Sequence, residues 1–171
     1  MSIYFFGHTK PNGEFSNFFP CEFTDGKTTF NCSEQRFMYM KVVTFKPDNQ
    51  KLINMILNET RPSYIKRYGS SKYLKTFDEK VWSEIRFDIM LDTLRLKFGQ
   101  NEHLKAHLLS TGTKMLYEAS YRDAIWGIGY GYKQAQQVPP EQYGQNLLGK
   151  ALMIVRDELS QKGVVKDDSS E

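Results

Sequence analysis

The longest regular pattern in the sequence lies between Asp78 and Phe98, and it restricts the fold more than any other feature. Apolar residues recur there at the 3.6-residue period of an amphipathic helix, namely Trp82, Ile85, Ile89, Leu91, Leu94 and Phe98. Asp78 is the expected N-cap, because its carboxylate can accept hydrogen bonds from the first amide groups of the helix. Gly99 is expected to end it. The pattern therefore predicts a long helix over 78–98.

Shorter helical segments are expected on both sides of this helix, separated by proline and glycine. They cover residues 31–44, 48–59, 64–68, 102–109 and 146–161. The first is expected to be capped by Asn31 or Ser33, and the third to close at Gly69, where a positive φ is useful.

Strands are expected mainly near the N-terminus. Residues 3–30 mix β-favouring aromatics with turn signals at 11–13 and 25–26, which predicts two or three short strands, and 115–118 is a further candidate. The expected fold class is mainly α (α+β), with a small N-terminal β-sheet.

A chain of 171 residues with 40% hydrophobic and 25% charged residues has the size and composition of one globular domain. We expect this domain over residues 1–163 and a frayed C-terminal tail over 164–171. The sequence has no signal peptide pattern and no stretch of about 18 apolar residues, so a cytoplasmic protein without membrane association is expected.

Charge and metal-ligand residues exclude some classes of site. The net charge is +3 and the basic residues are spread along the chain, so no block typical of nucleic-acid binding is present, although a small phosphate-bearing substrate is compatible. Cys21 and Cys32 lack metal-ligand spacing and are expected to be reduced. His103 and His107 stand at i, i+4, but no carboxylate is placed as in HExxH, so neither a metal nor a cofactor is expected.

Aromatic residues are abundant, at 14%, and many of them lie before residue 31. The simplest interpretation is an aromatic layer in the core. The alternative is that one or two of these rings stack on a nucleobase, since every base has a π-face.

Glu34 stands at the start of the helix expected over 31–44, on one face with Phe37, Met38 and Lys41. Glu34 could close a capping box with Asn31, and Lys41 could extend its stem along the apolar stripe towards solvent. Alternatively, Lys41 is an amine inside a pocket, where desolvation favours the neutral, nucleophilic form and a carboxylate acts beside it.

A second candidate site is the segment from Asp123 to Gly129, in which an acid and Trp126 precede alternating glycines. Glycines permit close approach of the backbone to a ligand, and their amide groups can bind phosphate or ribose oxygens. The segment lacks the spacing of a dinucleotide fingerprint, so a Rossmann fold is rejected.

The order of these features along the chain resembles the YbiA-like family, also called NADAR. The matching motifs are Phe15-Ser16-Asn17-Phe18, Ser33-Glu34 with Phe37 and Lys41, Trp82 with Arg86 and Met90, Lys97-Phe98, Leu108-Leu109 with Thr111, Glu118 with Asp123, Trp126-Gly127 with Gly129, Asn146-Leu147-Leu148-Gly149, and Leu152-Met153 with Arg156.

The resemblance implies an N-glycosidase that cleaves the bond between a ribose carbon and a nitrogen. The expected substrate is ADP-ribose attached to guanine, in guanosine, DNA or RNA. Phosphoribosylamino-pyrimidine intermediates of riboflavin biosynthesis are the alternative substrate, and a non-catalytic ADP-ribose-binding module is the alternative from another class. By resemblance the catalytic residues are Glu34, Lys41 and Asp123, and the substrate contacts are Asn17, Phe18, Trp82, Trp126, Gly127, Gly129 and Asn146.

Two mechanisms fit these residues. In one, Glu34 activates water against a cationic sugar while Asp123 holds ribose hydroxyl groups. In the other, Glu34 assists ring opening and Lys41 attacks the anomeric carbon to form an imine that water resolves. The second is the working hypothesis, with Trp82 or Trp126 stacked on the base or shielding the site from water.

Overall fold

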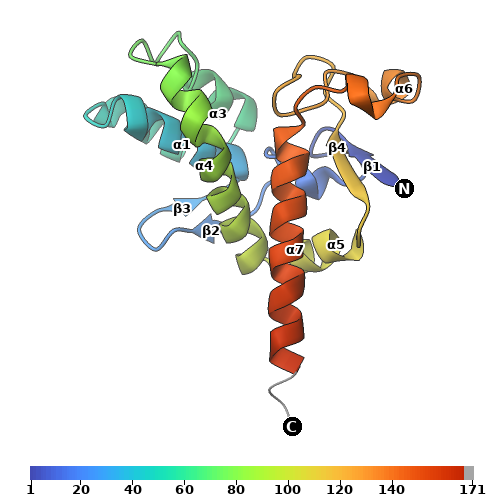
Figure 1. Cartoon of the computed structure of the whole chain (residues 1–171). Coiled ribbons are helices and arrows are strands. Elements are labelled where there is room, and N and C mark those ends of the chain that lie inside the picture. The colour runs from blue at the N-terminus through green and yellow to red at the C-terminus, as the bar shows by residue number, and fades with distance from the viewer. Residues whose placement is uncertain (168–171) are drawn as a thin grey trace. The chain divides into compact units, whose positions relative to one another are not determined.

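The computed structural model describes residues 1–167, with side chains up to residue 163, and divides the chain into two compact units. One unit is the continuous segment Asn17–Gln100. The other combines Met1–Ser16 with the chain from Asn101 onward. Helices dominate both units, so the expected mainly helical α+β class is confirmed (Figure 1).

The segment Asn17–Gln100 is built around helix α1 (Ser33–Phe45), which packs against α2 (Gln50–Asn58), α3 (Pro62–Tyr68) and α4 (Glu79–Gln100). Short strands β2 (Phe23–Thr24) and β3 (Thr29–Phe30) form an antiparallel hairpin before α1. Because three helices cover α1, most of the side chains in its first two turns are buried. This burial positions the residues at the start of α1.

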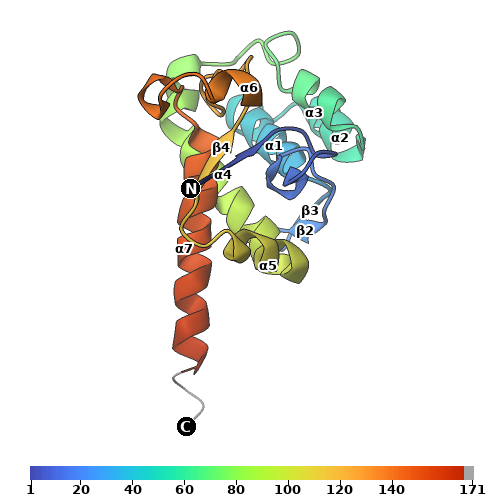
Figure 2. The same ribbon diagram turned by 90° about the vertical axis from the view of Figure 1, so that its right-hand side faces the viewer.

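In the other unit, strand β1 (Ser2–Phe5) pairs in parallel with β4 (Met115–Glu118), and both views show the two strands together (Figures 1 and 2). Helix α7 (Leu147–Asp167) packs against β4 and against α5 (Glu102–Ser110). The short helix α6 (Tyr132–Ala135) and the 3-10 turns η1 (Gly13–Phe15) and η2 (Pro140–Gln142) complete this unit.

Several predicted boundaries are corrected by the structure. The N-cap of α1 is Cys32, not Asn31 or Ser33, and α4 continues through Gly99 to Gln100. Gly69 has a φ of −82°, so it is not needed for a left-handed conformation. Its missing side chain instead leaves room for Met38, with which a Cβ atom would clash.

The strands also differ from the single N-terminal sheet that was expected, because β1 finds its partner at residues 115–118 and β2 pairs with β3 alone. Residues 115–118 were correctly predicted as a strand. At the other end, α7 extends to Asp167, past the boundary predicted at residue 163. Residues 168–171 of the predicted tail lie outside the described range, and the single-domain boundary stays a prediction.

Four of the aromatic residues near the N-terminus form core. Phe5, Phe15, Phe23 and Phe30 are all buried. Phe5 packs edge-on against Phe15 in one unit, and Phe23 packs against Phe30 with tilted rings in the other. At these four positions the core interpretation is the correct one.

Asn146 connects the start of α7 to β4. Its Nδ2 donates to the carbonyl of Leu116 at 2.9 Å, and its Oδ1 accepts from the amide of Glu118 at 3.1 Å. The residue itself has a φ of 51°, a left-handed conformation that asparagine tolerates better than most residues.

Replacing Asn146 by alanine should therefore reduce the free energy of unfolding by about 3 kcal/mol, since a buried carbonyl and a partly buried amide lose their partners and the left-handed backbone becomes strained. Urea denaturation measures this change. Asn58→Ala, at an exposed position at the end of α2, is the matched control and should change stability by less than about 0.5 kcal/mol. Equal stability of the two variants would contradict this role of Asn146.

Candidate active site

Glu34 lies in the first turn of α1 and only 6% of its surface is exposed. Its backbone amide donates to the carbonyl of Asn17 at 2.9 Å, which attaches the segment before β2 to the helix start. The capping box considered for Glu34 and Asn31 is formed differently, because the amide of Asn31 donates to Oε1 of Gln35 at 2.8 Å. The side chain that accepts from the Asn31 amide is therefore Gln35 and not Glu34.

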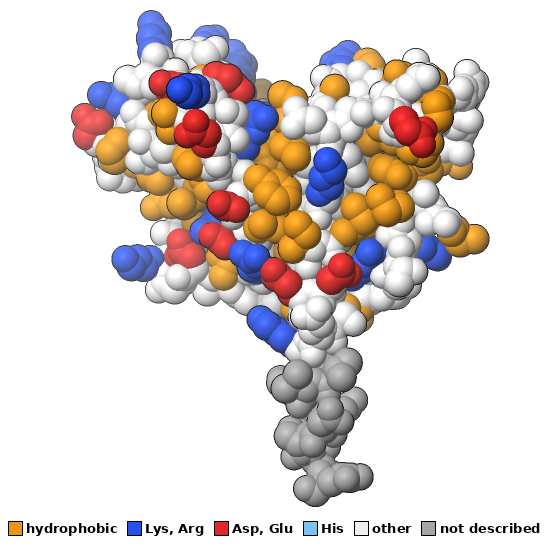
Figure 3. Space-filling model, in the orientation of Figure 1, with side chains coloured by type: hydrophobic (Ala, Val, Ile, Leu, Met, Phe, Trp, Pro, Cys, Tyr) orange, Lys and Arg blue, Asp and Glu red, His pale blue; other side chains and the backbone are white. Residues whose placement is uncertain are grey.

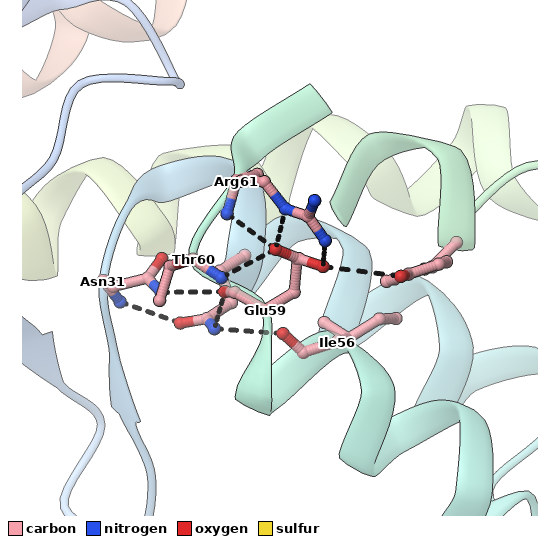
Figure 4. A network of polar contacts seen from close by, with 7 residues as sticks. Asn31, Ile56, Glu59, Thr60 and Arg61 are labelled. Atoms are coloured by element: carbon pink, nitrogen blue, oxygen red, sulfur yellow. Dashed lines mark hydrogen bonds and ion pairs between the residues drawn. The ribbon is translucent and has the colours of Figure 1, made fainter. Parts of the chain in front are cut away.

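Gln35 joins the start of α1 to the end of α2, and Figure 4 labels its partners Asn31, Ile56 and Glu59. Its Nε2 donates to the carbonyls of Ile56 at 3.0 Å, Leu57 at 3.1 Å and Glu59 at 3.3 Å. The carbonyl of Glu59 also accepts from Nδ2 of Asn31 at 3.0 Å. The buried amide of Gln35 thus provides a donor for carbonyl groups at the end of α2 that have no partner within the helix.

The carboxylate of Glu59 extends the same network towards the surface (Figure 4). It accepts from Nε and Nη2 of Arg61 at 2.8 and 2.9 Å and from the amides of Thr60 and Arg61. These hydrogen bonds, chiefly those from the Arg61 side chain, lower the pKa of Glu59 to about 2. The turn between α2 and α3 is thereby held in one conformation beside Gln35.

Arg36, the next residue, fastens α1 to α4. It is buried, and its Nη1 donates to Oγ1 of Thr93 at 2.7 Å and to the carbonyl of Ile89 at 3.3 Å. Burial lowers the pKa of Arg36, while the charges of Asp92 and Asp25 act in the opposite direction. Glu34 is thus followed by two buried polar residues that bind different helices.

Lys41 lies two turns further along α1 and is surrounded by aromatic rings. Its Nζ is 4.4 Å from the centroid of the Phe77 ring and 5.5 Å from that of Trp82. Trp82, itself 4% exposed, packs against Phe37 at 5.1 Å between ring centroids. The Lys41 amine is therefore turned into an aromatic environment rather than extended into water.

Burial lowers the pKa of Lys41 below its ordinary value, whereas the charges of Glu34 and Glu79 raise it. The pKa shift thus has the direction that increases the fraction of neutral amine. It also shows that Glu34 and Glu79 are the carboxylates that interact electrostatically with this amine. Glu34, Lys41 and Trp82, all predicted from the sequence, are brought together in the segment Asn17–Gln100.

Two further residues of α4 were assigned no role from the sequence, although Arg86 belongs to the matching motif with Trp82. Glu79 precedes Trp82 by one turn, and Arg86 follows it by one turn, so that all three lie on one face of α4. Nη1 of Arg86 is 3.3 Å from Oε1 of Glu79. The helical spacing from Trp82 was the available signal, and only the structure shows that Arg86 is largely buried.

Lys97 was quoted in the motif Lys97-Phe98 without a role. It is fully buried, with Nζ 5.1 Å from the centroid of the Phe98 ring and 5.8 Å from that of Phe19. Desolvation raises the pKa of the Cys32 thiol to about 12, and the charges of Glu34 and Lys97 act on this thiol in opposite directions. Both charges therefore lie close to the start of α1.

Asn17 and Phe18 precede this region and are both half-buried. The carbonyl of Asn17 is used by the amide of Glu34, while its side-chain Oδ1 is buried and has no hydrogen-bond partner among the described residues. A buried acceptor of this kind is suited to a ligand hydroxyl group.

The predicted site residues of the other unit lie in the loop after β4. Oδ1 of Asp123 accepts from the amides of Ile125 at 2.9 Å and Trp126 at 2.8 Å, so this carboxylate shapes its own loop. Gly127 is required there, because a Cβ atom would lie 2.8 Å from the carbonyl oxygen of Asp123 and 2.9 Å from that of Glu118. Gly129 has a positive φ of 74°. The structure thus brings Asp123, Trp126, Gly127 and Gly129 together.

The described residues contain neither a cluster of metal ligands nor a membrane-spanning helix. Among residues 1–163, no group of three or more His, Cys, Asp or Glu side chains could hold a metal ion, and the expected metal independence stays a prediction. His107 contacts Asn12 and Glu14. On the face in Figure 3, basic and acidic side chains are interspersed. No helix of the described chain is long and apolar enough to span a bilayer.

Comparisons with known proteins agree with this reading of the motifs. The model of the NADAR domain matches residues 4–160. The chain is 36% identical to N-glycosidase R617 of Acanthamoeba polyphaga mimivirus, over 86% of this chain and 88% of that protein. It is 33% identical to N-glycosidase YbiA of Escherichia coli, over 92% and 88% of the two chains.

A third relative is a longer protein with a different name. The riboflavin biosynthesis protein VVA0006 of Vibrio vulnificus is 31% identical over 93% of this chain, which covers 39% of that longer protein. Among solved structures, the NMR structure of the E. coli protein YbiA superimposes with a TM-score of 0.75 at 28% identity, covering 96% of this chain and 89% of YbiA.

The fold and the motifs define a YbiA-like protein. The chain belongs to the NADAR domain family, and the family match extends over both compact units.

Gln35 offers a test of how the start of α1 is held. Gln35→Met keeps the length of the side chain but removes the amide that joins α1 to the end of α2. We expect the free energy of unfolding to fall by about 3 kcal/mol, because buried carbonyl groups lose their donor.

Thermal or urea denaturation measures this effect. Gln50→Met is the control, since Gln50 only contacts Asn54 at an exposed position, and should change stability by less than about 0.5 kcal/mol. A Gln35→Met protein as stable as the parent would show that the network does not hold α1.

Proposed function

We propose that this protein is an N-glycosidase that hydrolyses the bond between the anomeric carbon of a ribose and the nitrogen of a base or amine. The single observation that supports this most strongly is the environment of Lys41, whose amine lies against Phe77 and Trp82 with a lowered pKa. The names of relatives that match most of the chain, N-glycosidase R617 and N-glycosidase YbiA, support the same activity.

The proposed reaction begins with opening of the ribose ring. The bond between the anomeric carbon and the ring oxygen breaks, the lone pair of the substrate nitrogen forms a C=N bond, and Glu34 gives a proton to the ring oxygen. A carboxyl group that is buried at the site can deliver this proton directly to the sugar.

Lys41 then adds its neutral amine to the anomeric carbon. A proton passes from the Lys41 nitrogen to the substrate nitrogen, which leaves as the free base or amine, and the sugar remains attached to Lys41 as an imine. Water adds to the imine carbon, the bond to Lys41 breaks, and Glu34 recovers its proton. In sum, one water molecule is consumed and the sugar and the amine are released.

The proposed substrate is ADP-ribose linked to guanine, in guanosine, DNA or RNA. The second candidate is a phosphoribosylamino-pyrimidine, which is favoured by the riboflavin biosynthesis name of the Vibrio vulnificus relative. For either substrate, the third proposed catalytic residue is Asp123. The proposed substrate contacts are Asn17, Phe18, Trp82, Trp126, Gly127, Gly129 and Asn146. A metal-free reaction in the cytoplasm is part of the same proposal.

The experiment that tests the activity is direct. The protein is incubated with ADP-ribosylated guanosine or DNA, and separately with phosphoribosylamino-pyrimidines, and the released base or amine is measured by chromatography. Release from one substrate class identifies the substrate. No release from either class would contradict the proposed function.

Glu34→Gln should lower kcat by about 100-fold or more, because the amide keeps the size of the side chain but cannot exchange a proton. Glu84→Gln, an exposed position on α4, is the matched control and should keep full activity. A Glu34→Gln variant with full activity and a lower melting temperature would assign Glu34 a purely structural role.

Lys41→Arg should abolish turnover, because the guanidinium stays protonated and cannot attack carbon. Borohydride added during turnover should fix the sugar to the parent protein, and peptide mapping should place the added mass on Lys41. The rate should rise with pH through a pKa below that of an ordinary lysine, since the neutral amine is the reactive form.

Lys51→Arg, at an exposed position of α2, controls for the loss of any lysine and should keep both turnover and the adduct. Substantial turnover by Lys41→Arg, or no adduct at Lys41 in an active sample, would favour direct attack by a water molecule that Glu34 activates.

A further inference from the structure

Helix α4 presents Glu79, Trp82 and Arg86 on one face, one turn apart, and the amine of Lys41 lies 5.5 Å from the centroid of the Trp82 ring. The proposed chemistry uses Lys41 and Glu34, with Trp82 as a substrate contact. It gives no task to Arg86, although this residue lies one helical turn from Trp82 in the same unit.

Arg86 is a largely enclosed cation, and Glu79 is its one hydrogen-bond partner among the described residues. Its side chain is 11% exposed, and its Nε is buried without a hydrogen-bond partner among the described residues. A guanidinium cannot lose its charge in a protein, so burying it without full hydrogen bonding is costly.

The ion pair with Glu79 compensates this cation only weakly. The Nη1 to Oε1 distance is 3.3 Å, and the Glu79 side chain is 66% exposed. Ion pairs with a solvent-exposed carboxylate contribute little. Arg86 is therefore a largely buried cation that lacks a well-placed anion, and a bound anion would provide it.

We propose that Arg86 binds the phosphate group attached to the ribose of the substrate and thereby places the anomeric carbon at Lys41. The sugar substrate in this statement rests on the proposed function. The planar guanidinium presents paired donors that match phosphate oxygens, which makes arginine well suited to this group.

The positions along α4 agree with a ribosyl phosphate. Trp82 and Arg86 are separated by about 6 Å along the helix axis, which is of the order of the distance between the anomeric carbon and the phosphate of a ribosyl phosphate. Lys41, on the same indole, is then at the sugar end and Arg86 at the phosphate end. Glu79 contacts Arg86 in the free protein, so it competes with the phosphate.

Ribose 5-phosphate is a suitable probe, because its binding needs no cleavage. Calorimetric titration should show that Arg86→Met binds it about 10- to 100-fold more weakly than the parent protein, through loss of charge-assisted hydrogen bonds. Arg86→Lys, which keeps the charge but not the paired donors, should lie between them. Arg95→Met is the matched control, since Arg95 is on the same helix and pairs with Asp92, and should bind as the parent does.

Glu79→Gln distinguishes phosphate binding from a structural role of the ion pair. If Arg86 binds phosphate, removing its competitor should tighten binding of ribose 5-phosphate by several-fold. If the ion pair with Glu79 only stabilises α4, Glu79→Gln should weaken binding as Arg86→Met does. Asp92→Asn removes a negative charge elsewhere on α4, and should leave the affinity unchanged.

Unmodified ribose completes the test, because Arg86→Met should bind it as the parent protein does. The proposal is wrong if the parent protein does not bind ribose 5-phosphate at millimolar concentration. It is also wrong if Arg86→Met binds the probe as tightly as the parent, or loses ribose and ribose 5-phosphate equally. Phosphate binding that depends on Arg86 in a protein that cleaves no N-glycoside would uphold this proposal and reject the proposed function.

Discussion

The amide of Gln35 and the guanidinium of Arg36 determine how α1 begins, and the candidate active site depends on that beginning. Gln35 is bound to the end of α2, and Arg36 is bound to α4. A polar group buried without partners would destabilise the fold, so both residues must keep these bonds. Helical geometry then fixes the direction of the preceding Glu34 and, two turns further, of Lys41.

Two opposing effects determine the pKa of the Lys41 amine. Removing the amine from water favours its neutral form, whereas Glu34 and Glu79 favour the charged form. The net shift is downward, so desolvation by the surrounding rings outweighs the two carboxylates. An amine balanced in this way can bind an anionic substrate when protonated and can react when neutral.

Features that depend on local periodicity could be predicted from the sequence. The helix that begins after Asp78 is capped as predicted, with Oδ1 of Asp78 accepting from the amides of Lys80 and Val81. Glu34 and Lys41 share a face of α1 because helical spacing requires it.

Features that depend on distant contacts could not be predicted from the sequence. The pairing of β1 with β4 joins residues that are far apart in the sequence, and short strands have no local signal that identifies their partner. Likewise, Gln35 replaces Glu34 in the bond to Asn31 because the end of α2 holds its amide. The burial of Arg86 and Lys97 has the same origin, since charged residues give no indication in sequence that they will be enclosed.

The parallel pairing of β1 with β4 also has a consequence for synthesis of the chain. The segment Asn17–Gln100 is continuous, so all of its contacts are available once Gln100 has left the ribosome. Strand β1 emerges before that segment, but its backbone groups have no partner until Met115–Glu118 has also been made. Residues synthesised before Asn17–Gln100 thus acquire their hydrogen bonds after it, and the nascent chain exposes an unpaired strand edge throughout that interval.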